Sequence, residues 1–122
     1  MDVIATRTFT RAEGSGTYHV LVGKPVEVRH DEWRCDIEIR GPDGTTRDKA
    51  FGIDAIQALM LSFDVLRNNL SSISPPVHWH DMTVDIAFPR FIPIALGEDF
   101  YRRMESHIDG EIDRFNQRHE NR

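Results

Sequence analysis

The residues with the most evident chemical potential lie in one short stretch, PPVHWHDMT, at positions 75–83. Alternate side chains of an extended chain point to the same side, so His78 and His80 would project together, with Cα atoms roughly 6.5 Å apart. Two imidazoles placed in this way can share a metal ion. A zinc site needs three or four ligands, however, and Asp81 would point away from the pair. The segment His30-Asp31-Glu32 could supply further ligands if the fold brings it near.

The same stretch also has a purely structural interpretation, in which Trp79 anchors the loop in an apolar pocket while its polar neighbours face water. Metal sites normally show a second pair of ligands at a recognisable spacing, and the sequence has no such pair. We therefore expect no metal ligands and no cofactor. A metal- or small-ligand-binding enzyme that uses the His78–Asp81 loop remains the alternative.

Two other groups of residues could take part in catalysis. Cys35 would need a lowered pKa and a neighbouring base to act as a nucleophile. It shares its strand parity with apolar residues, so we predict that it packs in the core. Glu105, Asp109 and Asp113 recur at every fourth position and could act as paired carboxylates. They lie opposite an apolar stripe, so a solvated helical face is the better interpretation.

The sequence contains none of the common motifs of catalysis or nucleotide binding. GxGxxG turns, P-loops, GxSxG, HExxH and EF-hand loops are all absent. Gly14-Ser15-Gly16 is predicted to be a hairpin turn, with no helix after it to offer its amides to a phosphate. We therefore predict no catalytic residues, and the sequence favours a non-enzymatic role.

These residues must be positioned by elements that the hydrophobic pattern defines. The first half of the chain alternates between apolar and polar residues, which is typical of strands with one face in water. In residues 33–40, WRCDIEIR, one face would carry Trp33, Cys35, Ile37 and Ile39, and the other Arg34, Asp36, Glu38 and Arg40. Further strands are expected at 3–11, 17–30 and 45–51. The last of these follows the turn GPDG at 41–44. The middle one is interrupted at Gly23 and Pro25, and its apolar residues share one parity: Tyr18, Val20, Val22, Val26 and Val28.

The pattern then changes to the three- and four-residue steps of a helix. The inward positions are predicted to be Ile56, Leu59, Met60, Phe63, Leu66 and Leu70. Asp54 and Gln57 resemble a capping box at its start. Further apolar residues widen the arc, so we expect this helix to be buried on two sides and to pack across the sheet.

A fifth strand is predicted at 82–88, MTVDIAF, and a second helix from about Glu98. The second helix would turn Phe100, Met104, Ile108, Ile112 and Phe115 inward. Gly110 could introduce a kink. The expected fold class is α+β: an antiparallel sheet of about five strands, made of a four-strand N-terminal meander, then helix, strand and C-terminal helix, with the helices on one face. Residues 1–122 are expected to form a single domain.

The composition limits the classes of function. Hydrophobic residues make up 39% and charged residues 29% of the 122, as in a globular protein, and the formal net charge is −5. No basic stripe is present, which argues against nucleic-acid binding. The single cysteine allows no disulfide within the chain. We find no signal-peptide pattern and no apolar stretch long enough to span a membrane, and we expect a cytoplasmic protein.

Several short segments together resemble a known kind of protein. They are Val22-Gly23-Lys24-Pro25, Trp33-x-Cys35, Gly52-x-Asp54-x-x-Gln57-Ala58-Leu59 and Phe88-Pro89. Over residues 20–90 the chain resembles a family of small bacterial single-domain proteins of unknown function. The resemblance implies a bacterial source and carries over no catalytic residues.

We therefore expect a small acidic protein that binds another protein, in the manner of an immunity protein or a regulator. The polar strand face of Arg34, Asp36, Glu38 and Arg40 is the expected contact surface. The negative net charge suggests a partner with a basic surface. A homodimer that pairs through an exposed strand edge could accompany this role.

Overall fold

The computed structural model describes residues 1–11 and 16–120. Its contacts divide the chain into two compact units, Met1–Arg90 and Phe91–Arg122, and each is described by itself. Most of the turn predicted at Gly14-Ser15-Gly16 lies outside the described residues.

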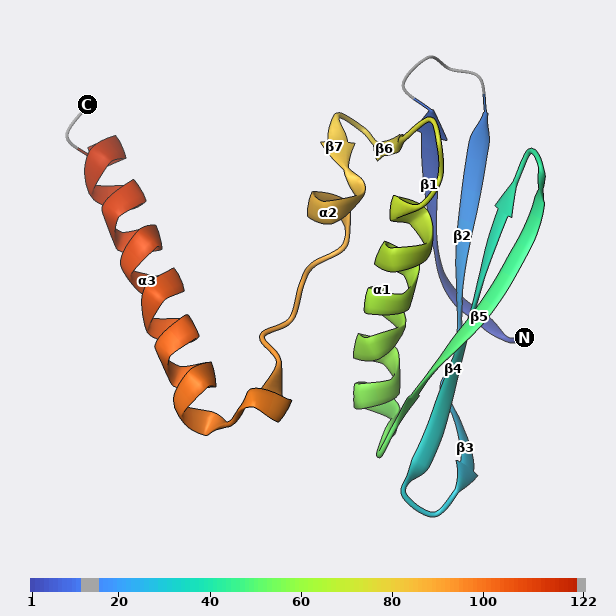
Figure 1. Cartoon of the computed structure of the whole chain (residues 1–122), viewed down its shortest axis with the longest axis horizontal. Helices are drawn as coiled ribbons and strands as arrows, with labels where there is room; N and C mark the ends of the chain where they lie inside the picture. Colours follow the sequence, from blue (N-terminus) through green and yellow to red (C-terminus); the bar gives the residue numbers. More distant parts are fainter. Residues whose placement is uncertain (12–15, 121–122) are drawn as a thin grey trace. The chain divides into compact units, whose positions relative to one another are not determined.

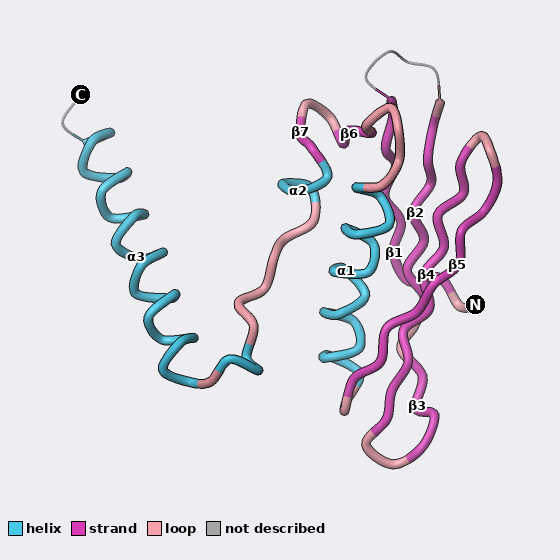
Figure 2. Tube along the Cα trace, in the orientation of Figure 1, coloured by secondary structure: helices cyan, strands magenta, loops and turns pink. Residues whose placement is uncertain are grey.

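The first unit contains an open antiparallel sheet of seven strands (Figure 1). They are β1 (Val3–Arg11), β2 (Thr17–Gly23), β3 (Val26–Arg29), β4 (Glu32–Gly41), β5 (Gly44–Gly52), β6 (Val77–Trp79) and β7 (Met82–Thr83). The strand β4 pairs with β5 along one side and with β2 and β3 along the other, and β1 then joins β2 to the short β6–β7 hairpin (Figure 2). The predicted α+β fold is confirmed, with two more strands than expected.

The predicted hairpin around GPDG is present, since Gly41 pairs with Gly44 and the strands run on from there. The interruption predicted at Gly23 and Pro25 is also present, and it separates β2 from β3. Val26 and Val28, however, are 49% and 42% exposed and do not share the buried face of β2. They are exposed because β3 pairs only with the first residues of β4, at the end of the sheet.

The helix α1 (Ala55–Ser71) begins where its capping residues predicted. The Asp54 carboxylate accepts a hydrogen bond from the Gln57 amide at 2.8 Å, and the Gln57 side chain accepts one from the Ile53 amide at 2.7 Å. These contacts satisfy amides that lack partners inside the helix.

The packing of α1 differs from the prediction. The helix packs on β4 and β5 through one row at four-residue steps: Ala58, Ser62, Leu66 and Leu70. Ile56, predicted to face inward, is 70% exposed, and Leu61 is 39% exposed. The expectation of burial on two sides was therefore wrong, because the small residues Ala58 and Ser62 let the helix approach the sheet along their own row.

The core lies between α1 and the inner face of the sheet. Its most buried members are Phe9, Val20, Cys35, Ile37, Leu66, Leu70 and Val77. The Phe9 ring stacks on Phe88, with centroids 5.5 Å apart. Strand β4 therefore turns inward the residues that its alternation predicted, with Trp33 only partly buried.

The strand predicted at 82–88 is not present as a single element. The structure has the two-residue strand β7 and then a short helix, α2 (Val84–Ala87). Val84 and Ala87 are buried, while Ile86 is 69% exposed, which is the three-residue step of a helix and not the alternation of a strand. One helical turn is too short to produce a periodic signal in the sequence.

The second unit contains a short 3-10 helix, η1 (Ile94–Leu96), and the helix α3 (Glu98–Glu120). The predicted start at Glu98 is confirmed, and the helix continues through Gly110. None of the α3 side chains is buried, and Ile108, Ile112 and Phe115 are about half exposed.

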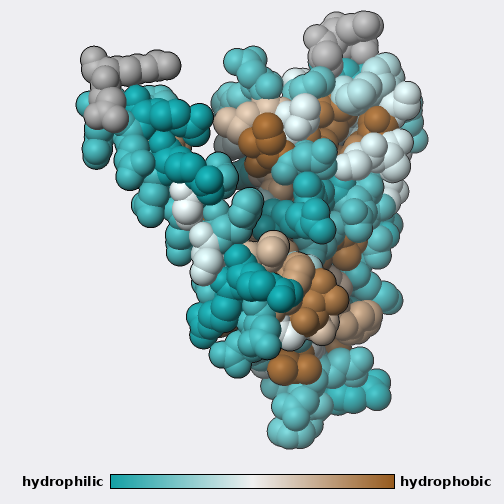
Figure 3. All heavy atoms as spheres, turned by 60° about the vertical axis from the view of Figure 1, so that its left-hand side comes forward, coloured by the Kyte–Doolittle hydropathy of each residue, from teal (hydrophilic) through white to brown (hydrophobic). Residues whose placement is uncertain are grey.

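The surface seen in Figure 3 is mostly hydrophilic, with separate apolar patches.

Candidate functional site

The sheet of residues 1–90 has one face that its helices do not cover. Both α1 and α2 lie on the same side of the sheet (Figure 1), and the opposite side is called the outer face below. The pairing registers assign to it the side chains Thr6, Thr8, His19, Leu21, Arg34, Asp36, Glu38, Arg40, Thr45, Arg47, Lys49 and Phe51. The four residues that the sequence predicted to form a polar face are all among them.

Glu38 is the centre of an ion-pair cluster on the outer face. Its carboxylate accepts a hydrogen bond from Nε of Arg47 at 2.9 Å and from Nε of Arg40 at 3.0 Å. Arg47 stands directly opposite Glu38 across the β4–β5 pair, so the strand register brings the two together. The two guanidinium groups cover the carboxylate, and only 11% of the Glu38 side chain is exposed, against 57% for Arg40 and 75% for Arg47.

The hydrogen bond from Arg47, assisted by Arg40, lowers the pKa of Glu38 below its ordinary value. Glu38 therefore stays ionised at neutral pH. Its contribution to stability is complete above the pKa of an unfolded glutamate and is lost as the pH falls through the lowered pKa. This cluster is a permanent feature of the face under physiological conditions.

The outer face is cationic although the chain as a whole is acidic. Asp36 pairs with Arg34 at 3.0 Å, so both carboxylates of the face are engaged in ion pairs. Among the side chains named above, four cations (Arg34, Arg40, Arg47, Lys49) stand against two carboxylates (Asp36, Glu38), an excess of two positive charges. Glu32, at the start of β4, has the same parity, and Arg29 pairs with it at 2.6 Å. The net charge of −5 therefore arises elsewhere on the molecule.

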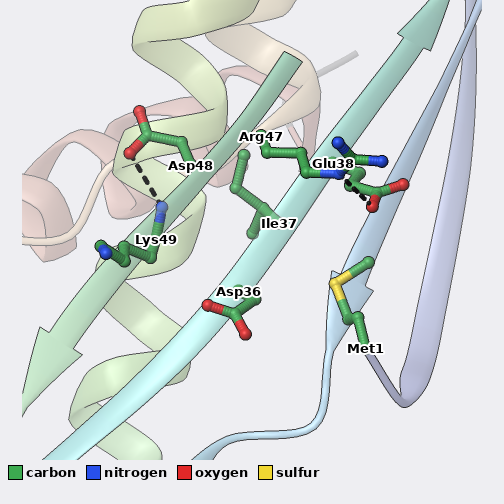
Figure 4. Close-up of a pocket in the computed structure, with 7 residues that line it drawn as sticks. All are labelled: Met1, Asp36, Ile37, Glu38, Arg47, Asp48 and Lys49. Atoms are coloured by element: carbon green, nitrogen blue, oxygen red, sulfur yellow. Dashed lines mark hydrogen bonds and ion pairs between the residues drawn. The ribbon is translucent and has the colours of Figure 1, made fainter. Parts of the chain in front are cut away.

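An open hollow of about 420 Å³ lies against this face, and Figure 4 shows its lining. Asp36 and Glu38 extend from β4, while β5 contributes Arg47, Asp48 and Lys49, and Met1 closes one side (Figure 4). Hydrogen bonds from Asn69 and from the Lys49 backbone amide, together with the Lys49 charge, lower the pKa of the Asp48 carboxyl. The Lys49 ammonium lies 5.9 Å from the centre of the Phe51 ring.

The structure does not assemble the ligand set that the histidines could have formed. His80 and Asp81 are the two loop residues of the β6–β7 hairpin, and His80 has a φ of 54°, so the chain is not extended there. In the second histidine segment, His30 and Asp31 form the β3–β4 turn and Glu32 begins β4, at the opposite end of the sheet (Figure 1). Among the described residues, no three His, Cys, Asp or Glu side chains are grouped so that they could hold a metal ion.

Trp79 holds the loop, as the structural interpretation predicted, but its neighbour His78 is partly buried and does not face water as expected. The Trp79 side chain packs against the core, and the guanidinium of Arg7 lies over its ring at 4.0 Å from the centroid. His78 is paired in the sheet with Thr10 and Thr83. Its Nδ1 is buried and has no hydrogen-bond partner among the described residues.

Replacing His80 by glycine should stabilise the protein by about 0.5–1 kcal/mol. A left-handed backbone costs a residue with a side chain roughly 1–2 kcal/mol, part of which glycine loses again through its greater freedom in the unfolded chain. Urea unfolding of His80→Gly would measure the change. Asp81→Gly is the matched control and should be destabilising, because Asp81 does not have a positive φ. The His80 ring also makes an edge-on contact with the Trp79 ring, with centroids 4.8 Å apart, and a less stable His80→Gly protein would show that this contact outweighs the relief of backbone strain.

The other two candidate groups are Cys35 in β4 and a row of acidic residues on α3. Cys35 is fully buried, its Sγ donates a hydrogen bond to the Gly23 carbonyl at 3.3 Å, and burial raises the pKa of its thiol. The predicted core position is confirmed. Glu105, Asp109 and Asp113 lie on α3, where Arg102 bridges Glu105 at 3.1 Å, and none of them is buried. They form a solvated helical face.

The fold and the outer face define a small α+β domain with one open, charged side. Comparison with known families identifies it further: residues 5–90 match the family described as domain of unknown function DUF6968. This match covers well over half of the chain, so the chain belongs to that family, as the resemblance over residues 20–90 predicted. The family region ends at Arg90, which is also the last residue of the first unit.

No curated protein and no solved structure matches the chain. In the part of the chain that the structure describes, no helix combines the length and apolar character needed to cross a membrane.

Proposed function

We propose that this protein is a non-enzymatic interaction domain that binds another protein through the outer face of its sheet. The observation that supports this most is the outer face itself, an open strand surface whose carboxylates are already paired with arginines. The proposed setting is the bacterial cytoplasm, on the basis of the sequence resemblance and the single reduced cysteine.

The charges of the outer face change the expected partner. The net charge of the chain suggested a basic partner, but a binding surface acts through its local charges. The excess of cations on the outer face favours a partner with an acidic surface. Arginine is enriched at protein interfaces, and Arg40 and Arg47 present exposed, oriented guanidinium groups. Opposite charges would also accelerate association with such a partner.

The proposal can be tested by reversing charge on the face without disturbing the Glu38 cluster. Thr45→Glu with Lys49→Glu changes two exposed side chains of β5 and makes the face more negative by three charges. We expect this variant to bind partners from the host at least tenfold more weakly than the unchanged protein. Affinity capture with quantitative mass spectrometry would identify partners, and biolayer interferometry would then give each Kd. Increasing salt should weaken the unchanged complex.

The matched control places the same change in charge on the second unit. Asn116→Glu with Arg118→Glu alters two exposed residues of α3 and also adds three negative charges. This control should retain the partner, and both variants should keep the melting temperature of the unchanged protein. If the β5 variant bound every partner with unchanged Kd, the outer face would not be the binding surface and the proposal would be wrong.

A further inference from the structure

A second candidate site lies on the inner face of the sheet, opposite the outer face. The helix α1 covers β4 and β5, and the inner face of β1 and β2 beside it is left with a cavity of about 320 Å³. Its apolar walls are formed by Val20 and Val22 of β2, Phe63 of α1 and Phe88 after α2. Ala5 and Arg7 of β1 also line it. All these residues belong to the unit of residues 1–90.

Arg7 is the charged group of this cavity, and its position is unusual. The guanidinium lies 4.0 Å from the centroid of the Trp79 ring and 5.5 Å from that of Phe88. One Nη1 donor bonds the Ala87 carbonyl. Among residues 1–11 and 16–120, no carboxylate forms an ion pair with Arg7, although the chain carries more acidic than basic side chains.

Partial burial costs the Arg7 cation some of its hydration, and its contacts with Trp79 and Phe88 offset part of this cost. A paired anion would offset more of it. A guanidinium has five N–H donors, and the Ala87 carbonyl occupies one of them, so a bidentate pair of donors is available for a carboxylate. Stacking on Trp79 fixes the plane of the group, which lowers the entropy lost on binding.

We propose that this cavity binds a small molecule with an apolar body and one carboxylate. The carboxylate pairs with Arg7, and the apolar body lies against Val20, Val22, Phe63 and Phe88. The single positive charge of Arg7 matches a monoanion and not a dianionic phosphate. The volume is near the lower end for small-molecule sites, about 300 to 1,000 Å³, so the ligand is a short aliphatic or aromatic acid. This proposal does not depend on the proposed protein interface.

Titration of the full chain with octanoate and with octanol, followed by NMR, tests the proposal. We expect octanoate to shift the methyl signals of Val20 and Val22 and the Nε–Hε signal of Arg7 in a saturable way. Octanol has the same apolar chain without the charge and should bind at least tenfold more weakly. Equal affinity for the two probes, or no saturable shift with millimolar octanoate, would overturn the proposal.

Two variants separate the roles of the apolar walls and the guanidinium. Ala5→Leu fills the cavity from an exposed strand position and should abolish the octanoate shifts, whereas Thr8→Leu adds a similar side chain on the outer face and should leave them unchanged. Arg7→Gln keeps a donor for the Ala87 carbonyl and should remove the preference for octanoate over octanol. Octanoate binding that survives Ala5→Leu would place the site elsewhere and would also contradict the assignment.

Discussion

Replacing Phe9 by alanine should lower the free energy of unfolding by about 3–5 kcal/mol, the range for large aromatic side chains removed from a core. Phe9 is fully buried, and its ring stacks on Phe88 with centroids 5.5 Å apart. Phe88 in turn stacks on Phe63 of α1, with ring centroids 6.1 Å apart. The substitution therefore leaves a cavity where β1, α1 and the segment after α2 meet. Such a loss is a large part of the stability of a small domain.

Urea unfolding followed by far-UV circular dichroism would measure this loss. Thr8→Ala is the neighbouring control, since Thr8 is exposed on the outer face and should cost less than about 1 kcal/mol. A loss of less than 1 kcal/mol for Phe9→Ala as well would mean that these three rings do not form the core.

Replacing Gly52 by alanine should destabilise the protein by about 1–3 kcal/mol, because the added methyl group has no space. A Cβ at this position would meet the backbone nitrogen of Ala58 and would lie 2.9 Å from the carbonyl carbon of Gln57. These are backbone atoms of the first turn of α1, which cannot rotate away as a side chain can. The helix would have to move off β5, and the row that begins at Ala58 would lose its contact with the sheet.

The matched control for this substitution is Gly110→Ala in α3. The nearest atom to a Cβ there is the Arg114 side chain at 3.5 Å, an ordinary contact, and alanine is the better helix former by about 1 kcal/mol. The melting temperature and the helical circular dichroism signal should therefore be unchanged or higher in Gly110→Ala and clearly lower in Gly52→Ala. If Gly52→Ala melted at the same temperature as the unchanged protein, the contact between β5 and α1 would be looser than described.

Local patterns in the sequence predicted much of the sheet and the start of α1. Alternation in β4 identified its buried and exposed residues, because a central strand with one face in water has a strict two-residue period. The Asp54–Gln57 cap was predictable since both partners lie within four residues of each other. Such signals depend only on the residues of one element.

The errors occurred where packing between distant elements decides the outcome. The apolar residues of α1 extend around most of the helix, and only its contact with β4 and β5 selects the row of Ala58 and Leu66 for burial. Likewise, α2 forms where the chain turns after a two-residue strand. Neither effect has a periodic signature in the sequence.

The same limit applies to the candidate sites. The four residues of the β4 face were predicted, but the cover that Arg47 gives to Glu38 depends on the register of β4 against β5. The cavity beside Arg7 was not predicted at all. Arg7, Val20, Phe63 and Phe88 are spread over most of the family region, and only the folded chain brings them together.

The burial of Cys35 gives this protein a natural reporter of its own opening. The reactive form of cysteine is the thiolate, and burial both raises the pKa of this thiol and shields its sulfur from solvent. A thiol reagent therefore modifies the single cysteine only in the fraction of molecules in which β4 has separated from its surroundings, at a rate proportional to that fraction when reclosing is faster than modification. Alkylation under native conditions, followed by intact mass, would convert that rate into a free energy of opening for the centre of the sheet without any added probe.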